Sequence, residues 1–239
     1  MGARVKSVEP LTRFLDHLWV EYGLSPHSVA AYRGDLGTLA EFLARRGLTL
    51  DDAGEADLFD FLGQHDKLSA RTKARRLSSM RRYYQFQLRE AALSVDPTVR
   101  LSAPRLGRSL PKSLSEKDVE ALLAAPDTDS PLGLRDRAML ELLYATGLRV
   151  SELVTLEVAQ VNTRQGVVRV TGKGAKERLV PLGEEALDWL QRFVGEARAE
   201  LCRGRPSNAL FPTQRGAAMS RQAFWYLIKR YALKAGIAA

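Results

Sequence analysis

Residues 134–153 read LRDRAMLELLYATGLRVSEL and decide how the second half of the chain folds. The run 138–158 is mostly apolar and typical of a protein core, yet it contains Arg149. Arginine is rarely buried unless it is paired, and its charge cannot be neutralised. Gly147 is a candidate C-cap for a helix over 132–145, and a shorter helix follows it. We therefore expect Arg149 at the start of that second helix, with its neighbours anchored in the core.

The next distinctive stretch, residues 164–187, reads RQGVVRVTGKGAKERLVPLGEEAL. Valines alternate on both sides of a glycine-rich turn that begins at Gly172, which predicts a β-hairpin. A capping box at 115–118 opens another helix. Helices are expected over 116–125, over 184–200 and from Ser220 to the end. The second half is therefore predicted to be α+β, with a small sheet among helices.

Helical periodicity covers the first part of the chain. Four helices are expected there, over 10–22, 25–47, 55–64 and 69–91. The second begins with Ser25 as N-cap and Pro26 at the first helical position. A segment rich in proline and arginine follows and has no clear period, which is typical of a linker. We predict a mainly α fold with a four-helix N-terminal DNA-binding domain over 1–98, a linker over 99–112 and an α+β domain over 113–239.

Composition narrows the functional classes. With 239 residues, 45% of them hydrophobic, the chain can bury one large core or two modest ones. The net charge of +8 favours nucleic acid over a membrane surface as partner, although an ordinary basic protein has the same balance. Cys202 is the only cysteine, which excludes an internal disulfide and a cysteine zinc cluster. Without a signal-peptide or membrane-spanning pattern, we expect a cytoplasmic protein with no membrane insertion.

Positive charge is concentrated in the fourth predicted helix. From Lys67 to Arg89 the sequence has eight basic residues and no acidic one, and the next acidic residue is Glu90. A helix with charges of one sign repels itself unless an anion lies against it, so a phosphate backbone is the natural partner. The candidate DNA-binding residues are Lys67, Arg71, Lys73, Arg75, Arg76, Arg81 and Arg82, with Arg105 in the linker. They suggest a two-part clamp around a duplex. The alternative is a solvated basic helix.

The last predicted helix starts with Ser220, Arg221 and Gln222. The N-terminal end of a helix can enter a major groove, where arginine pairs with guanine and glutamine with adenine. In the alternative, Ser220 is only an N-cap and Arg221 a surface residue. The sequence favours neither interpretation.

Three stretches together resemble the tyrosine site-specific recombinases, and within them the Xer chromosome-resolution enzymes. They are the two quoted above and LFPTQRGAAMSRQAFW at 210–225. The resemblance implies an N-terminal SAM-like core-binding domain and a catalytic domain that needs no metal, no ATP and no other cofactor. Members of this family cut one DNA strand with a tyrosine hydroxyl, form a 3′-phosphotyrosyl link, and reseal it with the hydroxyl of a partner strand.

The resemblance also implies roles for single residues. By its motif Arg149 corresponds to the first of the family's two catalytic arginines, whose planar fork suits two phosphate oxygens. Glu152 is expected to orient that guanidinium, and the alternative is a buried structural ion pair between the two. Lys173 matches the hairpin lysine that acts as general acid to the leaving 5′ oxygen. Lys176 and Arg178 are expected to be phosphate or structural contacts.

The sequence departs from the family pattern at its end. It stops at Ala239, where the family's His-x-x-Arg pair, a later His or Trp and the nucleophilic tyrosine would follow. None of its seven tyrosines stands at the position of the nucleophile. We therefore expect the chain as given, with a catalytic domain incomplete at the C-terminus, to bind DNA without cleaving it.

Partners follow from the same resemblance. We expect double-stranded DNA with a half-palindromic recombination site, a XerC-type partner recombinase in a heterotetramer on that DNA, and a septal DNA translocase of the FtsK type. Free of DNA, the chain is expected to be a monomer. Two alternatives stay open: a non-catalytic DNA-binding factor with the recombinase fold, and a small phage or mobile-element integrase. Arg149 and Lys173 argue for the enzyme, since binding alone needs neither, and the Xer-like stretches argue against a type IB topoisomerase.

Overall fold

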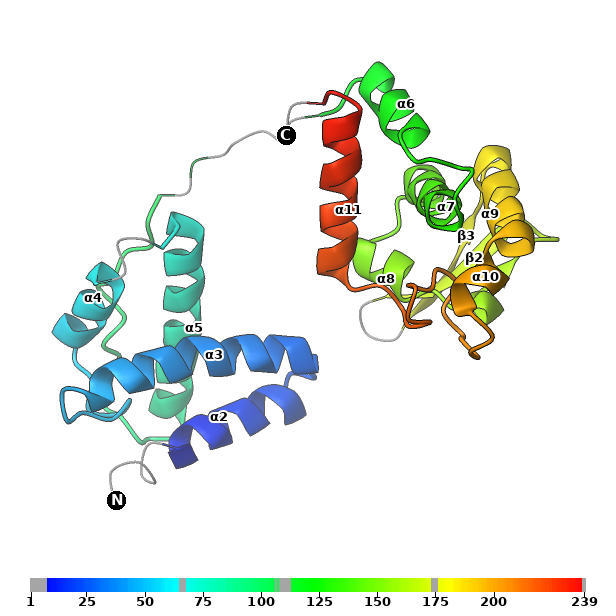
Figure 1. Cartoon of the computed structure of the whole chain (residues 1–239). Helices are drawn as coiled ribbons and strands as arrows, with labels where there is room; N and C mark the ends of the chain where they lie inside the picture. Colours follow the sequence, from blue (N-terminus) through cyan, green and yellow to red (C-terminus); the bar gives the residue numbers. More distant parts are fainter. Residues whose placement is uncertain (1–7, 65–67, 106, 108–112, 173–175, 238–239) are drawn as a thin grey trace. The chain divides into compact units, whose positions relative to one another are not determined.

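The computed structural model of the chain describes residues 8–64, 68–105, 107, 113–172 and 176–237, and Figure 1 shows its elements. The chain divides into two compact units, Met1–Leu110 and Pro111–Ala239. Each unit has a buried hydrophobic cluster of its own. Each therefore has the property that defines a domain.

The described part of the N-terminal unit is helical, as predicted. Its helices are α2 (Val8–Val20), α3 (Pro26–Ala44), α4 (Glu55–Gly63) and α5 (Ala70–Arg89). Serine side chains fix where two of them begin. The Ser25 hydroxyl accepts a hydrogen bond from the backbone N–H of Ser28 at 3.3 Å, and Pro26 follows in the first turn. Ser69 accepts from the N–H of Thr72 at 3.2 Å in the same way.

The core of the N-terminal unit surrounds the buried ring of Phe14 on α2. This ring meets those of Tyr83 and Phe86 on α5 at centroid distances of 5.4 and 5.5 Å, within the range that aromatic pairs prefer. Leu101 also packs in this core, and its carbonyl accepts a hydrogen bond from Arg81. The sequence places Leu101 in the linker. The N-terminal unit thus continues further along the chain than predicted, because an apolar side chain after α5 finds room in its core.

The C-terminal unit is α+β, as predicted. Its helices are α6 (Glu116–Ala124), α7 (Pro131–Thr146), α8 (Val150–Val154), the 3-10 turn η1 (Val158–Gln160), α9 (Glu184–Glu196), α10 (Arg198–Cys202) and α11 (Arg221–Lys234). The antiparallel sheet has the order β1 (Val161–Asn162), β2 (Val167–Thr171) and β3 (Glu177–Pro181). The β2–β3 hairpin was predicted, whereas β1 is too short to give a periodic signal. The helix expected over 184–200 breaks at Ala197, whose φ of −123° is not helical.

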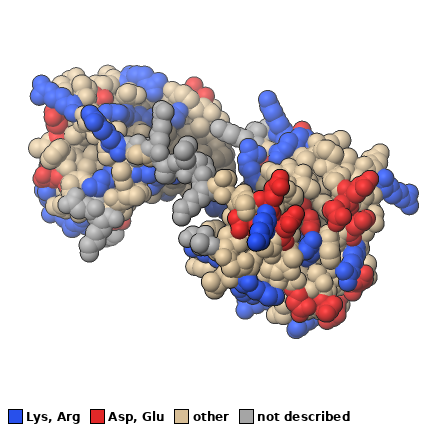
Figure 2. All heavy atoms as spheres, turned by 90° about the horizontal axis from the view of Figure 1, so that it is seen from above, with Lys and Arg blue, Asp and Glu red and all other residues tan. Residues whose placement is uncertain are grey.

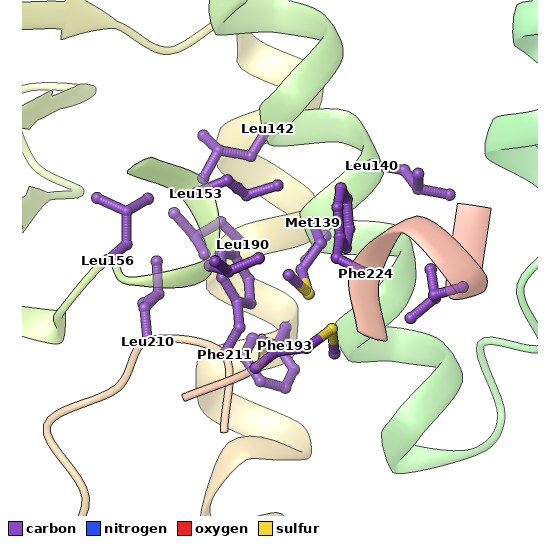
Figure 3. Close-up of a cluster of buried hydrophobic side chains, with 14 of the residues drawn as sticks. Met139, Leu140, Leu142, Leu153, Leu156, Leu190, Phe193, Leu210, Phe211 and Phe224 are labelled. Atoms are coloured by element: carbon purple, nitrogen blue, oxygen red, sulfur yellow. The ribbon is translucent and has the colours of Figure 1, made fainter. Parts of the chain in front are cut away.

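Helix α7 is the centre of the C-terminal unit and contacts α6, α8, α9 and α10. The core around it is shown in Figure 3 and includes Met139, Leu142, Leu190, Phe193, Phe211 and Phe224. The rings of Phe193 and Phe211 stack at a centroid distance of 5.6 Å. A helix that is packed on several sides cannot shift without disturbing its neighbours. The C-terminal end of α7 is therefore a fixed platform for the residues that follow it.

Helix α7 also buries a charge pair that the sequence analysis did not single out. Asp136 is 1% exposed, and one of its oxygens accepts from Nε and Nη2 of Arg135 at 2.9 and 2.7 Å. Its other oxygen accepts from the Tyr231 hydroxyl of α11 at 2.8 Å. Arg135 Nη1 donates to the carbonyl of Pro212 at 3.0 Å. Because buried charges are tolerated when they are paired and hydrogen-bonded, this network ties α11 and the loop before it to α7.

Candidate active site and DNA interface

Gly147 ends α7 and turns the chain toward α8. Its φ of 60° lies in the left-handed region, and its N–H donates to the carbonyl of Leu143 at 3.0 Å, as expected of a C-cap. Leu148 is buried, and Arg149 is the N-cap residue of α8. The Arg149 side chain, however, is 68% exposed. The buried Leu148 therefore anchors the backbone at Arg149, as predicted. The guanidinium of Arg149, however, lies in solvent, where an anion can reach it.

Glu152 lies between two arginines and is only 9% exposed. Arg149 donates its backbone N–H to Oε2 at 2.9 Å and Nη1 to Oε1 at 3.0 Å. Arg178 donates Nη1 to Oε1 at 3.0 Å and Nη2 to Oε2 at 2.8 Å. The hydrogen bonds from Arg178, followed by those from Arg149, lower the pKa of Glu152 to about 2 despite its burial. The acid is therefore buried and ionised, whereas its Arg149 partner is exposed, so the pair differs from the buried ion pair of the alternative interpretation.

The second predicted catalytic residue, Lys173, lies outside the described residues. The base of its hairpin is described, and there the N–H of Gly172 donates to the carbonyl of Lys176 at 2.8 Å. Lys176 is exposed, and Arg178 makes a structural contact, because its fork is directed to Glu152. The hairpin base therefore lies beside α8. A hollow of about 270 Å³ at this place is lined by Ser151, Glu152, Thr155, Leu156, Gln160, Val170 and Thr171.

The predicted basic helix α5 has an acidic partner on another helix. Asp35 of α3 is buried and lies against α5. It pairs with Nη1 of Arg75 at 2.5 Å, accepts from the Ser79 hydroxyl at 2.8 Å and lies 4.0 Å from Nε of Arg76. The charge pattern along α5 cannot reveal this acid, because it comes from a segment 40 residues earlier. Part of the positive charge of α5 is thus compensated inside the N-terminal unit.

Other arginines of α5 are also engaged by their own unit. Arg82 donates to the Tyr32 hydroxyl at 3.0 Å and lies 4.4 Å from the ring centroid of Tyr22, a cation–π contact. Arg81 donates to the carbonyl of Leu101. Of the remaining candidates, Arg71 and Arg105 are exposed, Lys73 is partly buried and Lys67 lies outside the described residues. Figure 2 shows Lys and Arg side chains over much of the N-terminal unit, and groups of Asp and Glu among them on the C-terminal unit.

The start of α11 shows both features that the sequence left open. The Ser220 hydroxyl caps the helix by accepting from the N–H of Ala223 at 3.1 Å. Arg221 and Gln222 are exposed in the first turn, so their side chains can be reached by a partner. The sequence analysis did not single out Trp225, which is half exposed one turn further on, with Lys229 Nζ 4.1 Å from its ring centroid.

Several tyrosines are held inside the fold. Tyr83 and Tyr84 are buried in the N-terminal core, and burial raises the pKa of both hydroxyls well above the usual value. Burial, followed by the charge of Asp136, raises the pKa of Tyr231 to about 12. All three hydroxyls donate hydrogen bonds within their own unit, Tyr83 to Asp51, Tyr84 to the carbonyl of Leu50 and Tyr231 to Asp136.

The described ranges lack two kinds of feature. No cluster of three or more His, Cys, Asp or Glu side chains in them is arranged to hold a metal ion. No helix in them combines the length and the apolar character that crossing a membrane requires.

Comparisons with known proteins match both units. A model described as the N-terminal SAM-like domain of phage integrases matches residues 11–91, and the phage integrase family model matches residues 112–239. The chain is a phage integrase family member, a tyrosine recombinase. This recombinase is 55% identical over 229 residues to "Tyrosine recombinase XerD" of Pseudomonas aeruginosa, covering 95% of this chain and 77% of that protein. It is 49% identical to the protein of the same name in Vibrio cholerae, covering 94% of this chain and 75% of that protein.

Solved structures share the fold of the recombinase. The structure of lambda integrase residues 75–356 bound to DNA has a TM-score of 0.70 at 16% identity, covering 97% of this chain and 79% of that one. The XerH site-specific recombinase bound to its difH substrate, in the pre-cleavage complex, has a TM-score of 0.70 at 21% identity, covering 89% of this chain and 64% of that one. The family models and the curated relatives confirm the predicted family and Xer type, and the solved structures confirm the predicted fold class.

Proposed function

We propose that this tyrosine recombinase is a site-specific DNA recombinase that cuts and rejoins strands through a 3′-phosphotyrosyl intermediate. The observation that carries the proposal is the exposed guanidinium of Arg149, held at one edge by the buried Glu152. Among the described residues, only Nη1 of this guanidinium has a partner. Its other donors are open to an anion, and a planar fork suits two phosphate oxygens.

The proposed chemistry assigns a step to each residue. A tyrosine hydroxyl passes its proton to solvent as its oxygen attacks the phosphorus, the bond to the 5′ oxygen breaks, and that oxygen takes a proton from Lys173. The hydroxyl of a partner strand later reverses the step. Arg149 stabilises the charge that develops on the phosphorus oxygens, and Glu152 fixes the guanidinium before the reaction begins, so that no reorganisation is needed. Lys176, at the base of the same hairpin, is exposed and available to bind a neighbouring phosphate.

The biological setting is part of the proposal. Relatives named XerD, among them the Pseudomonas aeruginosa protein at 55% identity over 95% of this chain, support a role in chromosome dimer resolution and segregation in the cytoplasm. In that setting the partners are a XerC-type recombinase, in a heterotetramer on DNA, and a septal translocase of the FtsK type. Among the candidate DNA-binding residues outside the Arg149 site, Arg71, Arg105, Arg221 and Gln222 have exposed side chains, which supports their role as DNA contacts.

DNA binding can be tested with the 239-residue chain itself. A duplex is selected by binding from a random pool and compared with a scrambled duplex of equal length. We expect preferential binding to the selected duplex, with an affinity that falls steeply as salt rises, since each phosphate contact releases counterions. We expect no covalent adduct with a nicked form of the duplex, because no tyrosine stands at the nucleophile's position. Equal binding to both duplexes would contradict the proposal, whereas an adduct would contradict the expectation that the chain as given does not cleave.

Catalysis needs a form that carries the family's nucleophile. The chain can be fused to the segment of the Pseudomonas aeruginosa relative that follows the matched region. We expect the fusion to form the adduct, Arg149→Ala to abolish it while DNA binding is kept, and Arg149→Lys to restore little, because lysine lacks the fork. A non-catalytic DNA-binding factor would give no adduct even in the parent fusion. If Arg149→Ala unfolds the C-terminal unit instead, the Arg149–Glu152 pair is structural and the catalytic assignment is wrong.

A further inference from the structure

We propose that Arg178 is a positioning residue for Arg149, and that it acts by occupying half of the Glu152 carboxylate. The inference rests on the proposed function, because it assumes that Arg149 binds the phosphate that is cut. Its basis is the arrangement of four N–H donors around one buried carboxylate. Nothing in the sequence motif assigns this role to Arg178, which we expected to contact phosphate or structure.

The way in which Glu152 is shared limits how it can hold Arg149. A carboxylate has two oxygens with about two acceptor sites each. Arg178 takes one site on Oε1 and one on Oε2. The backbone N–H of Arg149 takes a second site on Oε2, which leaves a single site on Oε1 for the Arg149 guanidinium. Glu152 can therefore accept only one hydrogen bond from the Arg149 guanidinium, through Nη1. The other N–H donors of that guanidinium stay available to a phosphate.

Removing Arg178 changes that balance. The two acceptor sites it vacates become available to Arg149, the other described arginine at this carboxylate. A bidentate pair is the favoured geometry of arginine with a carboxylate, so Arg149 would turn its fork toward Glu152. A fork engaged in that way has fewer donors for a phosphate. Arg178 thus keeps Arg149 in the orientation that DNA binding requires.

The position of Arg178 also links α8 to the hairpin. Arg178 lies on β3, where it is paired in register with Val170 of β2. Its Nη1 lies close to Gly172, so that a Cβ added there would be only 3.4 Å from that atom. The same guanidinium therefore touches the base of the hairpin and the carboxylate beside Arg149. A change at Arg178 is therefore felt at the Arg149 site through the Glu152 carboxylate.

The experiment uses the 239-residue chain and the selected duplex, with methylphosphonate placed at one position of the backbone at a time to remove its charge. At the phosphate bound by Arg149 we expect the neutral linkage to weaken binding about tenfold, the size of one hydrogen bond between charged groups. In Arg149→Gln the neutral linkage should no longer weaken binding at that one position. The position at which the penalty disappears identifies the phosphate that Arg149 binds. Arg178→Gln should lose most of the penalty at the same position and keep the penalties elsewhere. Arg169→Gln is the matched control, because this exposed arginine of β2 has no ion-pair partner among the described residues, and it should keep them all.

A second variant separates positioning from direct contact. If Arg178 acts by keeping the fork of Arg149 away from Glu152, then the double variant Arg178→Gln/Glu152→Gln regains the penalty at that phosphate, because the carboxylate that would engage Arg149 is gone. If Arg178 binds the phosphate itself, the double variant still lacks the penalty, which overturns the inference. A full penalty in Arg178→Gln overturns it as well. If Arg178→Gln does not fold, as judged by circular dichroism, Arg178→Lys keeps the charge without the fork and is tested in the same way, with the same loss expected. If Arg149→Gln keeps every penalty, the proposed function fails at its first step, and the inference fails with it.

Discussion

The change Glu152→Gln perturbs the centre of the site while keeping its shape. One of the two acceptor atoms becomes an NH₂ group that faces guanidinium donors, and the negative charge between Arg149 and Arg178 is lost. In the folded chain the pKa of Glu152 is about 2, compared with a usual value of 4.5. A difference of this size makes the charged form contribute about 3 kcal/mol to stability at neutral pH. We expect Glu152→Gln to lower the free energy of unfolding of the C-terminal unit by this amount.

The sign of the pKa difference fixes the pH dependence. Because the pKa is lowered on folding, the contribution is complete above about pH 5 and is lost as the pH falls through 4.5 toward 2. The difference between parent and variant should therefore shrink from about 3 kcal/mol at pH 7 to about 1.4 kcal/mol at pH 3. Urea unfolding followed by the fluorescence of Trp189, which packs against the C-terminal core, measures it.

Glu177→Gln is the control for this experiment, because Glu177 is exposed on the same hairpin, and it should change stability little at either pH. A difference for Glu152→Gln that is equal at pH 3 and pH 7 would refute the reasoning, because it would show that shape rather than charge is responsible. A negligible difference at pH 7 would refute it as well.

Three further changes test the framework that holds the site, each by urea or thermal unfolding. Gly147→Ala places a side chain at a φ of 60° with nothing within 4 Å of its Cβ, so it should cost about 1 kcal/mol through backbone strain alone, and Gly147→Asn should cost less. Phe193→Ala removes a fully buried ring beside α7 and should cost about 3–5 kcal/mol; a loss below about 1 kcal/mol would contradict the packing described. Asp35→Asn removes the buried charge that pairs with the half-exposed Arg75 and should destabilise the N-terminal unit by about 1–3 kcal/mol, with no change in the transition of the C-terminal unit.

Local signals in the sequence were sufficient for most of the fold. Ser25 caps α3 and the box at 115–118 caps α6 as predicted, and the left-handed Gly147 ends α7 where expected. These features are short-range, because a cap or a glycine turn is decided within a few residues. The β2–β3 hairpin was predicted for the same reason. The apolar run around Arg149 correctly predicted an anchored backbone, but it could not show that the side chain points to solvent.

The features that the sequence could not reveal are pairings between distant segments. Asp35 compensates arginines of α5 from another helix, and Arg178 reaches Glu152 from a strand 26 residues later. Leu101 packs in the N-terminal core although the sequence around it is typical of a linker. Charge patterns along one helix report only neighbours on that helix. The basic stretch in α5 was therefore taken to be more available for DNA than it is in the fold.

The most direct test of the account is a crystal structure of the 239-residue chain bound to the selected duplex. It measures the distances from the Arg149 guanidinium to the DNA phosphates. We expect Nη2 or Nε of Arg149 to lie about 2.7–2.9 Å from the oxygens of one phosphate. Nη1 should stay on Glu152, and Arg178 should keep both of its bonds to that carboxylate. A bound duplex whose phosphates all lie beyond hydrogen-bonding distance of Arg149 would contradict the central claim.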